Sequence, residues 1–341
     1  MTADRNRARF LVTGATGFIG RRLVRRLVAD FGAEAVACLI KPPQTELERD
    51  ALERFRSSGI QLLDGDLLNE PVSGDPPPAV EVVFHLAANI DTDAPEDALR
   101  VNDIGTSRLL DWLAPIVRGT RIMYASSVAV HDRARSPDGP ISEESPFTPR
   151  TAYGRTKLEG ERILRDRASR DGYEWTILRL PTVYGPGQKP DGLFDQLITQ
   201  ARNGGWLGRI DWPGRTSVVF VDDVAAIIIA LSSAPFAAGE VYCVASDDEV
   251  TVGELAQRVA VAVGRPIRPI RLPSPLVQTA RALVWSRAVQ SCVPRFAWLA
   301  FWRFSLVISD GFWFDTGKFR RAYSNRLRTL DEGLAEIIRQ A

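Results

Sequence analysis

The sequence is poor in cysteine and histidine and has no excess of charge of either sign. Its three cysteines, Cys38, Cys243 and Cys292, are far apart and odd in number. This argues against a disulfide framework or a cysteine zinc site and predicts a reducing compartment, the cytoplasm. The two histidines, His85 and His131, are too few for a histidine-rich site, so we expect no metal. With 43 Lys+Arg against 42 Asp+Glu, nucleic acid is a poor candidate partner.

Long apolar runs are also missing. The longest candidate, residues 296–308, contains Arg303 and falls short of the ~18–20 residues that span a bilayer. The first ten residues hold no apolar signal core. We therefore expect neither a transmembrane segment nor a secretory signal.

What is present is an alternation of apolar runs and amphipathic stretches. Strands are predicted at 10–12, 35–40, 60–63, 80–87, 121–125 and 175–180, and helices at 18–30, 45–58, 95–113 and 150–170. Such alternation predicts an α/β fold, a Rossmann doubly wound parallel sheet, with a smaller and mostly helical C-terminal substrate subdomain. We expect the NAD(P)-binding domain at 1–180 plus about 218–246, and the substrate subdomain at 181–217 and 247–341.

A glycine-rich turn follows the first predicted strand. Gly14, Gly17 and Gly20 lie in FLVTGATGFIG, between that strand and a helix. Glycines at this spacing allow a tight turn, a close approach to a pyrophosphate and close helix packing. The free N–H groups of the helix N-terminus then face the phosphates. A plain strand–helix turn is the alternative.

The end of the second strand bears on the choice of cofactor. An acidic residue there binds the 2′-hydroxyl of NAD, whereas a basic one accommodates the 2′-phosphate of NADP. This strand ends at Lys41, and Arg21 and Arg22 follow the glycine turn. We therefore expect NADP(H), with NAD(H) possible. The alternative is that Lys41 is only an exposed strand-end lysine.

A tyrosine and a lysine four residues apart suggest proton transfer. Tyr153 and Lys157 share one face of a predicted helix. A nearby ammonium favours the phenolate and lowers the phenol pKa. Upstream, a strand runs into Ser126 and Ser127, whose hydroxyls lie at the carboxyl edge where ligands bind. Both serines also suit a helix cap or turn.

Eight segments together resemble the extended short-chain dehydrogenase/reductase family, which is NAD(P)-dependent and epimerase/dehydratase-like. They are TGATGFIG (13–20), GDL (65–67), HLAA (85–88), VNDIGT (101–106), YASS (124–127), YGRTK (153–157), LRLPTVYGPG (178–187) and FVDDVA (220–225). They follow the order and spacing usual in the family. The chain most resembles the ketoreductases of the 3β-hydroxysteroid dehydrogenase and dihydroflavonol reductase type.

The resemblance implies roles for individual residues. Ser127, Tyr153 and Lys157 would be the catalytic set, with Tyr153 as acid/base and Lys157 holding the nicotinamide ribose. Asn102 would support the site, and His85 would lie near the cofactor without acting as a base. The cofactor would be bound by Gly14, Thr16, Gly17, Phe18, Ile19, Gly20, Lys41, Asp66, Leu67, Ala87, Ala88, Lys157, Pro181 and Val183.

The substrate class is less clear from the sequence. Nucleotide-sugar enzymes of this family commonly use an arginine before the FVDDVA-like strand, and that place falls on Thr216, one residue after Arg215. Trp or Phe fills nine of the 30 residues from 285 to 314. These aromatics favour a bulky apolar substrate, but a subdomain core or a peripheral membrane face is also consistent. His131 replaces a frequent family tyrosine; we expect altered packing, with substrate contact at the pocket rim as the alternative.

We therefore predict an NADPH-dependent ketoreductase that acts on a bulky hydrophobic or aromatic carbonyl compound, in secondary metabolism. The alternative is a nucleotide-sugar epimerase or dehydratase with tightly bound NAD. A third hypothesis, a catalytically silent cofactor-binding regulator, is disfavoured because Ser127, Tyr153 and Lys157 are all present. Relatives often dimerise through the helix that carries Tyr153, so a homodimer is expected.

Overall fold

The computed structural model describes residues 8–68, 72, 74–77, 80–131, 139–188, 190, 192–309 and 312–340. Its centre is a seven-stranded sheet in the order β10-β6-β5-β4-β1-β2-β3, in which every pair of neighbours is parallel. The strands are β1 (Phe10–Thr13), β2 (Val36–Ile40), β3 (Gln61–Asp64), β4 (Val82–His85), β5 (Arg121–Ser127), β6 (Glu174–Leu180) and β10 (Glu240–Cys243). The predicted Rossmann sheet is confirmed, because each of the six predicted strands is present.

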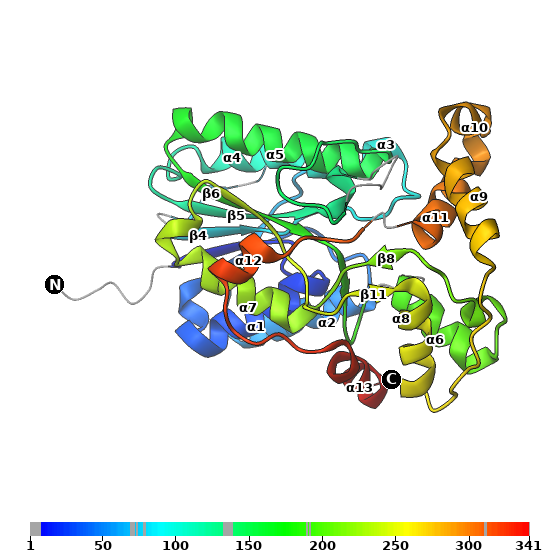
Figure 1. Ribbon diagram of the computed structural model, residues 1–341. Helices are drawn as coiled ribbons and strands as arrows, with labels where there is room; N and C mark the ends of the chain where they lie inside the picture. Colours follow the sequence, from blue (N-terminus) through cyan, green and yellow to red (C-terminus); the bar gives the residue numbers. More distant parts are fainter. Residues whose placement is uncertain are drawn as a thin grey trace.

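Helices cover both faces of this sheet (Figure 1). One face packs against α1 (Phe18–Phe31), α2 (Glu46–Ser57) and α7 (Val221–Ser232), the other against α4 (Ile104–Leu113) and α5 (Ala152–Asp171). All four residues of β1 and all five of β2 are buried. Strands covered on both sides are continuously apolar, which is why the pattern was recognisable in the sequence.

The predicted helix at 95–113 is wrong as a single element. The chain forms α3 (Glu96–Leu99), the 3-10 turn η2 (Arg100–Asn102) and then α4. The break has a local cause: the Asp103 carboxylate accepts a hydrogen bond from the backbone N–H of Ile104 and caps α4. The Asn102 side chain is also drawn away, to the backbone of Asn89.

The rest of the chain packs beyond the carboxyl edge of the sheet. Two small sheets pair β7 (Thr182–Tyr184) with β9 (Val218–Phe220), and β8 (Arg215–Thr216) with β11 (Val250–Thr251). The helices α6 (Leu193–Asn203), α8 (Val252–Ala262) and α13 (Leu330–Gln340) enclose a separate apolar cluster, and α12 (Gly317–Ala322) lies against β10. The exact division into two domains stays a prediction.

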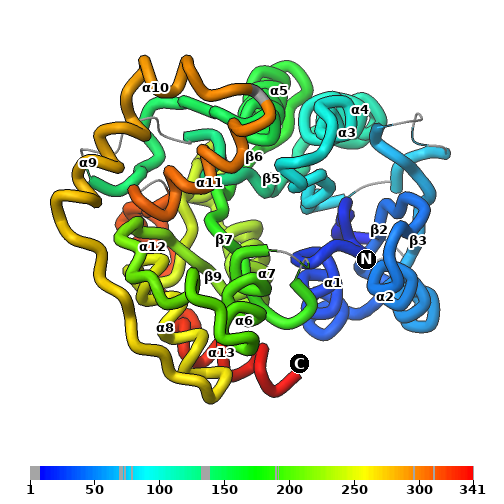
Figure 2. Tube along the Cα trace, turned by 90° about the vertical axis from the view of Figure 1, so that its right-hand side faces the viewer, coloured from blue at the N-terminus to red at the C-terminus, as the bar shows by residue number. Residues whose placement is uncertain are grey.

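Residues 274–308 form an outlying layer that we call the cap helices. It consists of α9 (Ser274–Trp285), α10 (Arg287–Cys292), the 3-10 turn η6 (Arg295–Ala297) and α11 (Trp298–Ile308). Figure 1 places these helices at one end of the molecule, and Figure 2 shows α9 and α10 outside α11. Within the described part of the chain, no helix is both long and apolar enough to cross a membrane.

Candidate active site

The turn between β1 and α1 has no room for side chains at its glycines. Gly14 has a φ of +67°, and a Cβ there would lie 2.7 Å from the backbone nitrogen of Ala87. A Cβ on Gly20 would lie 2.1 Å from the carbonyl oxygen of Gly14. Only glycine, whose side chain is a hydrogen atom, fits at these positions. The backbone of the turn is therefore open to close approach by a ligand.

The N-terminus of α1 fits an anionic group. Gly17 is the N-cap, no side chain caps the helix, and its first turn carries no acidic residue. Arg21, in the next turn, has a buried Nε without a hydrogen-bond partner among the described residues. Unsatisfied N–H groups and a buried guanidinium nitrogen are donors for phosphate oxygens. The residues present thus fit the pyrophosphate of a dinucleotide.

Arg22 contacts two neighbouring segments of the chain. Its guanidinium forms an ion pair with Asp222 at 3.2 Å and donates to the carbonyl of Pro186 at 2.6 Å. Arg22 therefore ties α1 to α7 and to the loop after β7. Arg21 and Arg22 each have a buried Nε without a hydrogen-bond partner among the described residues, but the Nε of Arg22 lies beside a carboxylate, 3.2 Å from Asp222.

His85 is a structural residue at the end of β4. Its Nδ1 lies 2.8 Å from the hydroxyl of Thr13, and its Nε2 lies 3.0 Å from that of Thr106. Thr106 donates its own proton to the carbonyl of Asn102, so it accepts from Nε2–H, and Thr13 donates to Nδ1. Burial, with the charge of Lys157, lowers the pKa of His85 to about 3. A neutral, fully bonded imidazole is no base, as expected from the sequence.

Ser127, Tyr153 and Lys157 meet at the carboxyl end of β5. Tyr153 and Lys157 lie one turn apart on α5, and the Tyr153 hydroxyl hydrogen-bonds the Ser127 side chain. Ser127 Oγ also accepts a hydrogen bond from the backbone of Ala129, so the predicted cap role is real too. Lys157 is 2% exposed, and its Nζ lies 4.3 Å from the centre of the Tyr124 ring.

The pKa values of the pair differ from the sequence prediction. Burial raises the pKa of Tyr153, and the hydrogen bond with Ser127 opposes that rise. Burial lowers the pKa of Lys157 to about 7, against the opposing charge of Glu161. A lysine titrating near neutrality is a weaker source of positive charge than an exposed one. The expected lowering of the phenol pKa by Lys157 is therefore wrong for the protein alone.

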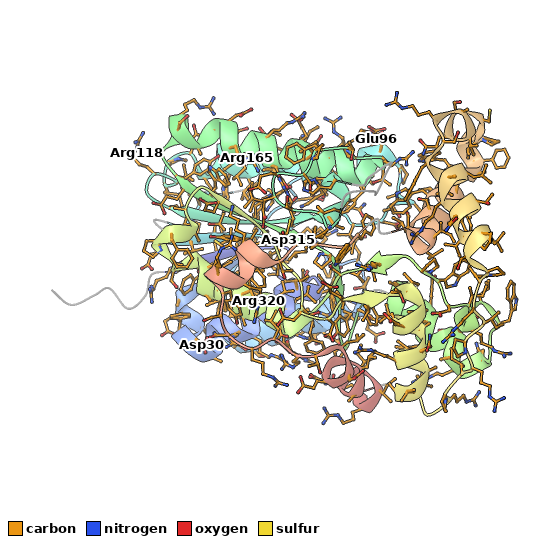
Figure 3. All side chains as sticks on the ribbon, in the orientation of Figure 1. Asp30, Glu96, Arg118, Arg165, Asp315 and Arg320 are labelled. Atoms are coloured by element: carbon orange, nitrogen blue, oxygen red, sulfur yellow. The ribbon has the colours of Figure 1, made fainter. Side chains whose placement is uncertain are left out.

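The neighbouring serine has a different partner. Ser126 Oγ donates to the carboxylate of Glu161, which also accepts Nε and Nη2 of Arg179 at 3.1 and 2.8 Å. Both members of this ion pair are 1% exposed. Arg165, labelled in Figure 3, adds a second guanidinium at 3.3 Å from Glu161. Ser126 therefore belongs to a buried structural network, and Ser127 alone faces Tyr153.

Two glycines let α5 approach the sheet. A Cβ on Gly154 would lie 2.3 Å from the carbonyl oxygen of Ala129, and one on Gly160 would lie 2.3 Å from the Tyr124 hydroxyl. Asn102 adds a polar tie, because its Nδ2 donates to the hydroxyl of Thr156 at 3.1 Å, next to Lys157. These contacts fix the helix beside β5, which agrees with the supporting role expected for Asn102.

His131 does not line a pocket rim. It is fully buried, its Nε2 accepts from Nη1 of Arg179 at 2.9 Å, and its ring stacks on Phe147. The alternative in which His131 contacts substrate at a pocket rim is wrong, because its ring is buried against Arg179 and Phe147; the expected change in packing relative to a tyrosine stays a prediction. Sequence reasoning missed Glu161 and Arg179; Arg179 inside an apolar strand was the available signal.

The other predicted cofactor residues occupy the carboxyl edge of the sheet and the loops around it. Thr16, Leu67 and Pro181 are buried; Phe18, Ile19, Asp66, Ala87 and Val183 are half-buried; Lys41 and Ala88 are exposed. Asp66 uses its carboxylate to accept the backbone N–H of Leu68 at 2.8 Å. Their contacts with a cofactor stay a prediction.

The aromatic C-terminal residues pack mainly against one another and their neighbours. Trp302 contacts Phe312, which packs with Phe314 on the cluster that includes Val128, directly after Ser127. The guanidinium of Arg215 lies 4.4 Å from the centre of the Trp313 ring, while Thr216 is buried in β8. An apolar wall thus flanks the serine.

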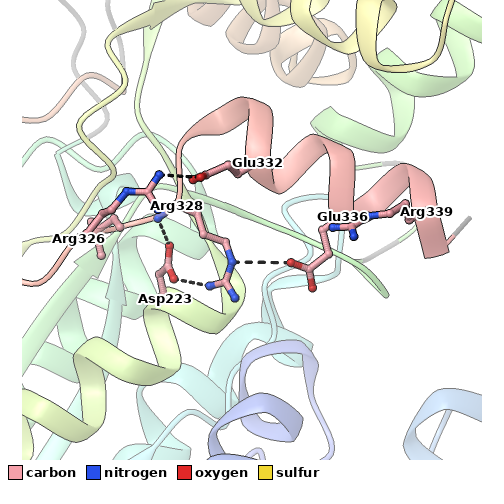
Figure 4. A pocket seen from close by; sticks show the side chains of 7 residues that line it. Asp223, Arg326, Arg328, Glu332, Glu336 and Arg339 are labelled. Atoms are coloured by element: carbon pink, nitrogen blue, oxygen red, sulfur yellow. Dashed lines mark hydrogen bonds and ion pairs between the residues drawn. The ribbon is translucent and has the colours of Figure 1, made fainter.

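A cavity of about 420 Å³ lies elsewhere, between α7 and α13. Its lining includes Asp223, which accepts two hydrogen bonds from Arg328, and Glu332, which pairs with Arg326 (Figure 4). Its charged groups largely satisfy one another, so we do not place the active site there.

Known proteins resemble this chain in sequence and in fold. Residues 10–245 match the model of the NAD dependent epimerase/dehydratase family. A UDP-glucose 4-epimerase of Mycolicibacterium smegmatis is 31% identical over 274 residues, 76% of this chain and 84% of that protein. A ceramide reductase of Caulobacter vibrioides is 30% identical over 281 residues, 81% and 77%. The structure of a UDP-glucuronic acid 4-epimerase from Bacillus cereus, with NAD, superposes with a TM-score of 0.72 at 22% identity, covering 97% and 98%, and supports the fold.

Proposed function

The chain belongs to the NAD-dependent epimerase/dehydratase family, and we propose that it transfers a hydride between bound NAD(P) and a carbon that carries a hydroxyl or carbonyl oxygen. The observation that carries this proposal is the meeting of Ser127, Tyr153 and Lys157 at the end of β5. Lys157 also lies close enough to lower the pKa of His85, whose ring contacts Thr13 beside the glycine turn. The proton-transfer groups and the dinucleotide cradle therefore share one edge of the sheet.

The residues of the site have separate roles in this reaction. Gly14, Gly17 and the N-terminus of α1 would hold the pyrophosphate, and NAD(P), when bound, supplies a hydride donor or acceptor. Ser127 hydrogen-bonds the substrate oxygen, and Tyr153 exchanges a proton with it. Because the pKa of Tyr153 is raised, its phenol is protonated at neutral pH, the state that donates a proton in carbonyl reduction; oxidation of a hydroxyl would require the phenolate.

For the substrate we place a nucleotide-linked sugar first. The Mycolicibacterium relative is named for such a substrate, and so is the Bacillus cereus protein of the same fold. An epimerase or dehydratase of this kind retains its NAD and consumes none of it overall. This reading requires the diphosphate to be bound without an arginine at position 216, where the chain has a buried threonine.

The second candidate is reduction of a hydrophobic ketone, the activity that the sequence alone predicts. Three observations favour it: the ceramide reductase relative, the Phe312–Phe314 wall beside Ser127, and the stacking of Arg215 on Trp313. A guanidinium held on an indole face is less available to a diphosphate.

With the second candidate, ketone reduction, we propose a preference for NADP(H), whereas the first candidate would retain NAD. Lys41 stands at the end of β2 where NAD-specific proteins carry an acidic residue. Burial and the nearby charges of Arg22 and Arg54 lower the pKa of Arg21, and the carboxylate of Glu48 opposes them, so cations outnumber acidic groups around Arg21. A 2′-phosphate would balance that charge.

One experiment separates these alternatives. The nucleotide released from purified protein is identified, and the protein is then assayed for epimerisation of UDP-sugars and for NADPH consumption with hydrophobic ketones. Retained NAD with sugar turnover supports the first candidate; exchangeable NADPH with ketone reduction supports the second. In either assay Tyr153→Phe should lower turnover about 100-fold or more. The control is Tyr323→Phe, which removes the hydroxyl of a buried tyrosine that stacks on Phe319 at the end of α12. Full turnover by Tyr153→Phe would refute the mechanism.

A further inference from the structure

The cap helices expose apolar side chains to solvent. On α9, Leu276 and Leu283 lie two turns apart on one face and are 55% and 52% exposed. Phe296, in η6, is 92% exposed. The exposed positions of α9 carry no charged residue, because its one arginine, Arg281, is half-buried and donates to the carbonyl of Ile308. The cap helices thus leave three large apolar side chains open to solvent.

Every charged residue in this part of the sequence is basic. Residues 255–309 contain eight arginines and none of the 42 acidic residues of the chain. Three of these, Arg268, Arg271 and Arg287, are exposed and form no ion pair with any residue that the structure describes. Arg258 and Arg303 pair with carboxylates of other segments, whereas Arg287 on α10 and Arg268 and Arg271 in the loop before α9 leave unpaired positive charge on and beside the cap helices.

We infer that the cap helices dock on the surface of an anionic lipid bilayer. Exposed Leu and Phe side chains enter the interface, while arginines lie among the headgroups, the arrangement that peripheral helices use. A second copy of the chain is a poorer occupant, because it would bring arginine-rich, carboxylate-free segments face to face. The inference does not rest on the proposed function and holds for either substrate class.

Docking would bring the active site next to the lipid. Arg150, three residues before Tyr153, donates to Gln290 of α10 at 2.7 Å and lies 5.0 Å from the centre of the Trp298 ring. On the other side, Arg303 of α11 forms an ion pair with Asp93 at 2.7 Å, in the loop after β4. The cap helices therefore connect the exposed face directly to segments that flank the site.

The test is flotation of the full chain with vesicles of phosphatidylcholine alone or mixed with phosphatidylglycerol. We expect binding to the mixed vesicles that weakens as salt is added. The triple variant Leu276→Ser, Leu283→Ser, Phe296→Ser should lower the partition coefficient about tenfold or more. Phe236→Ser removes a phenylalanine that is 60% exposed outside the cap helices, and should leave binding unchanged.

A second variant tests the charge and guards against misfolding of the first. Arg268→Gln, Arg271→Gln, Arg287→Gln changes only exposed side chains and should lower binding to mixed vesicles about tenfold. Both variants should bind the dinucleotide as the parent does. The inference is overturned if the parent binds neither vesicle at low salt, or if Phe236→Ser weakens binding as much as the triple variant. Loss of a dimer in the triple variant, without vesicle binding by the parent, would assign the face to a second copy.

Discussion

Lys157 and Glu161 are both buried and lie one turn apart on α5, yet they serve different networks. Lys157 faces the Tyr124 ring, whereas Glu161 pairs with Arg179 from β6. The carboxylate still raises the pKa of Lys157 against the effect of burial. The helix thus places a group of the candidate site and a structural ion pair on adjacent turns.

The buried pair should matter strongly for stability. Glu161→Gln leaves the Arg179 guanidinium buried without its counter-charge, so we expect a loss of about 3–5 kcal/mol in the free energy of unfolding. Glu159→Gln, which removes an exposed ion pair with Arg162 on the same helix, should cost less than about 0.5 kcal/mol. Urea unfolding measures both, and equal losses would contradict the assignment.

The two adjacent serines should separate activity from stability. Ser127→Ala removes the hydroxyl that contacts Tyr153 and should lower kcat about 100-fold; because that hydroxyl also accepts the backbone N–H of Ala129, the variant should lose about 1 kcal/mol of stability. Ser126→Ala removes a donor to Glu161, and should cost about 1.5–3 kcal/mol of stability. Steady-state kinetics and urea unfolding of both variants check this; a reversed pattern would move the candidate role to Ser126.

His85 should make the protein sensitive to acid. The ordinary pKa is 6.5 and the folded value about 3, so between these values the unfolded chain binds the extra proton. This contribution to stability is complete above pH 6.5 and falls by about 1.4 kcal/mol per pH unit below it, down to about pH 3. His85→Gln keeps hydrogen-bonding capacity but cannot titrate. Urea midpoints of variant and parent should therefore converge as the pH falls; parallel curves would show that His85 is not responsible.

The glycine turn should be sensitive to a single methyl group. Gly14→Ala forces a Cβ against the backbone of Ala87 and holds alanine at positive φ, so nucleotide affinity should fall about tenfold or more. Gly59 also has a positive φ, +77°, but nothing lies within 4 Å of its Cβ position. Gly59→Ala should therefore cost about 1 kcal/mol of stability and leave affinity unchanged. Titration calorimetry with NADP and NAD measures both variants.

Cofactor preference should depend on Lys41. Lys41→Glu places a carboxylate at the end of β2, and should weaken NADP binding about tenfold while leaving NAD binding similar or tighter. Arg118→Glu makes the same change of charge before the start of β5, at the opposite edge of the sheet, and should alter neither affinity. If Lys41→Glu leaves the ratio of the two affinities unchanged, the proposed NADP preference fails.

The sheet was predictable because strands buried on both faces must be continuously apolar, as in β1 and β2. The break before α4 was not, because it depends on a contact between Asn102 and Asn89 that only the folded chain creates. Arg179 and Glu161 were missed for a similar reason: charged residues are expected at the surface, and the two that pair are 18 positions apart in the sequence. The sequence pattern predicted the positions of the serine, tyrosine and lysine. Their pKa shifts could not be predicted, because these depend on how deeply the folded chain buries each side chain.

Gly154 and Gly160 set the tolerance of the candidate site. At each position a hydrogen atom occupies the space between α5 and a neighbouring oxygen. The position of α5 is therefore sterically restricted. If the helix moved by a few tenths of an ångström, its backbone would clash with Ala129 on one side or with Tyr124 on the other. The relative position of the Tyr153 phenol and the Lys157 amine depends on these two glycines. Substitutions elsewhere in the protein can therefore accumulate without moving the two groups apart.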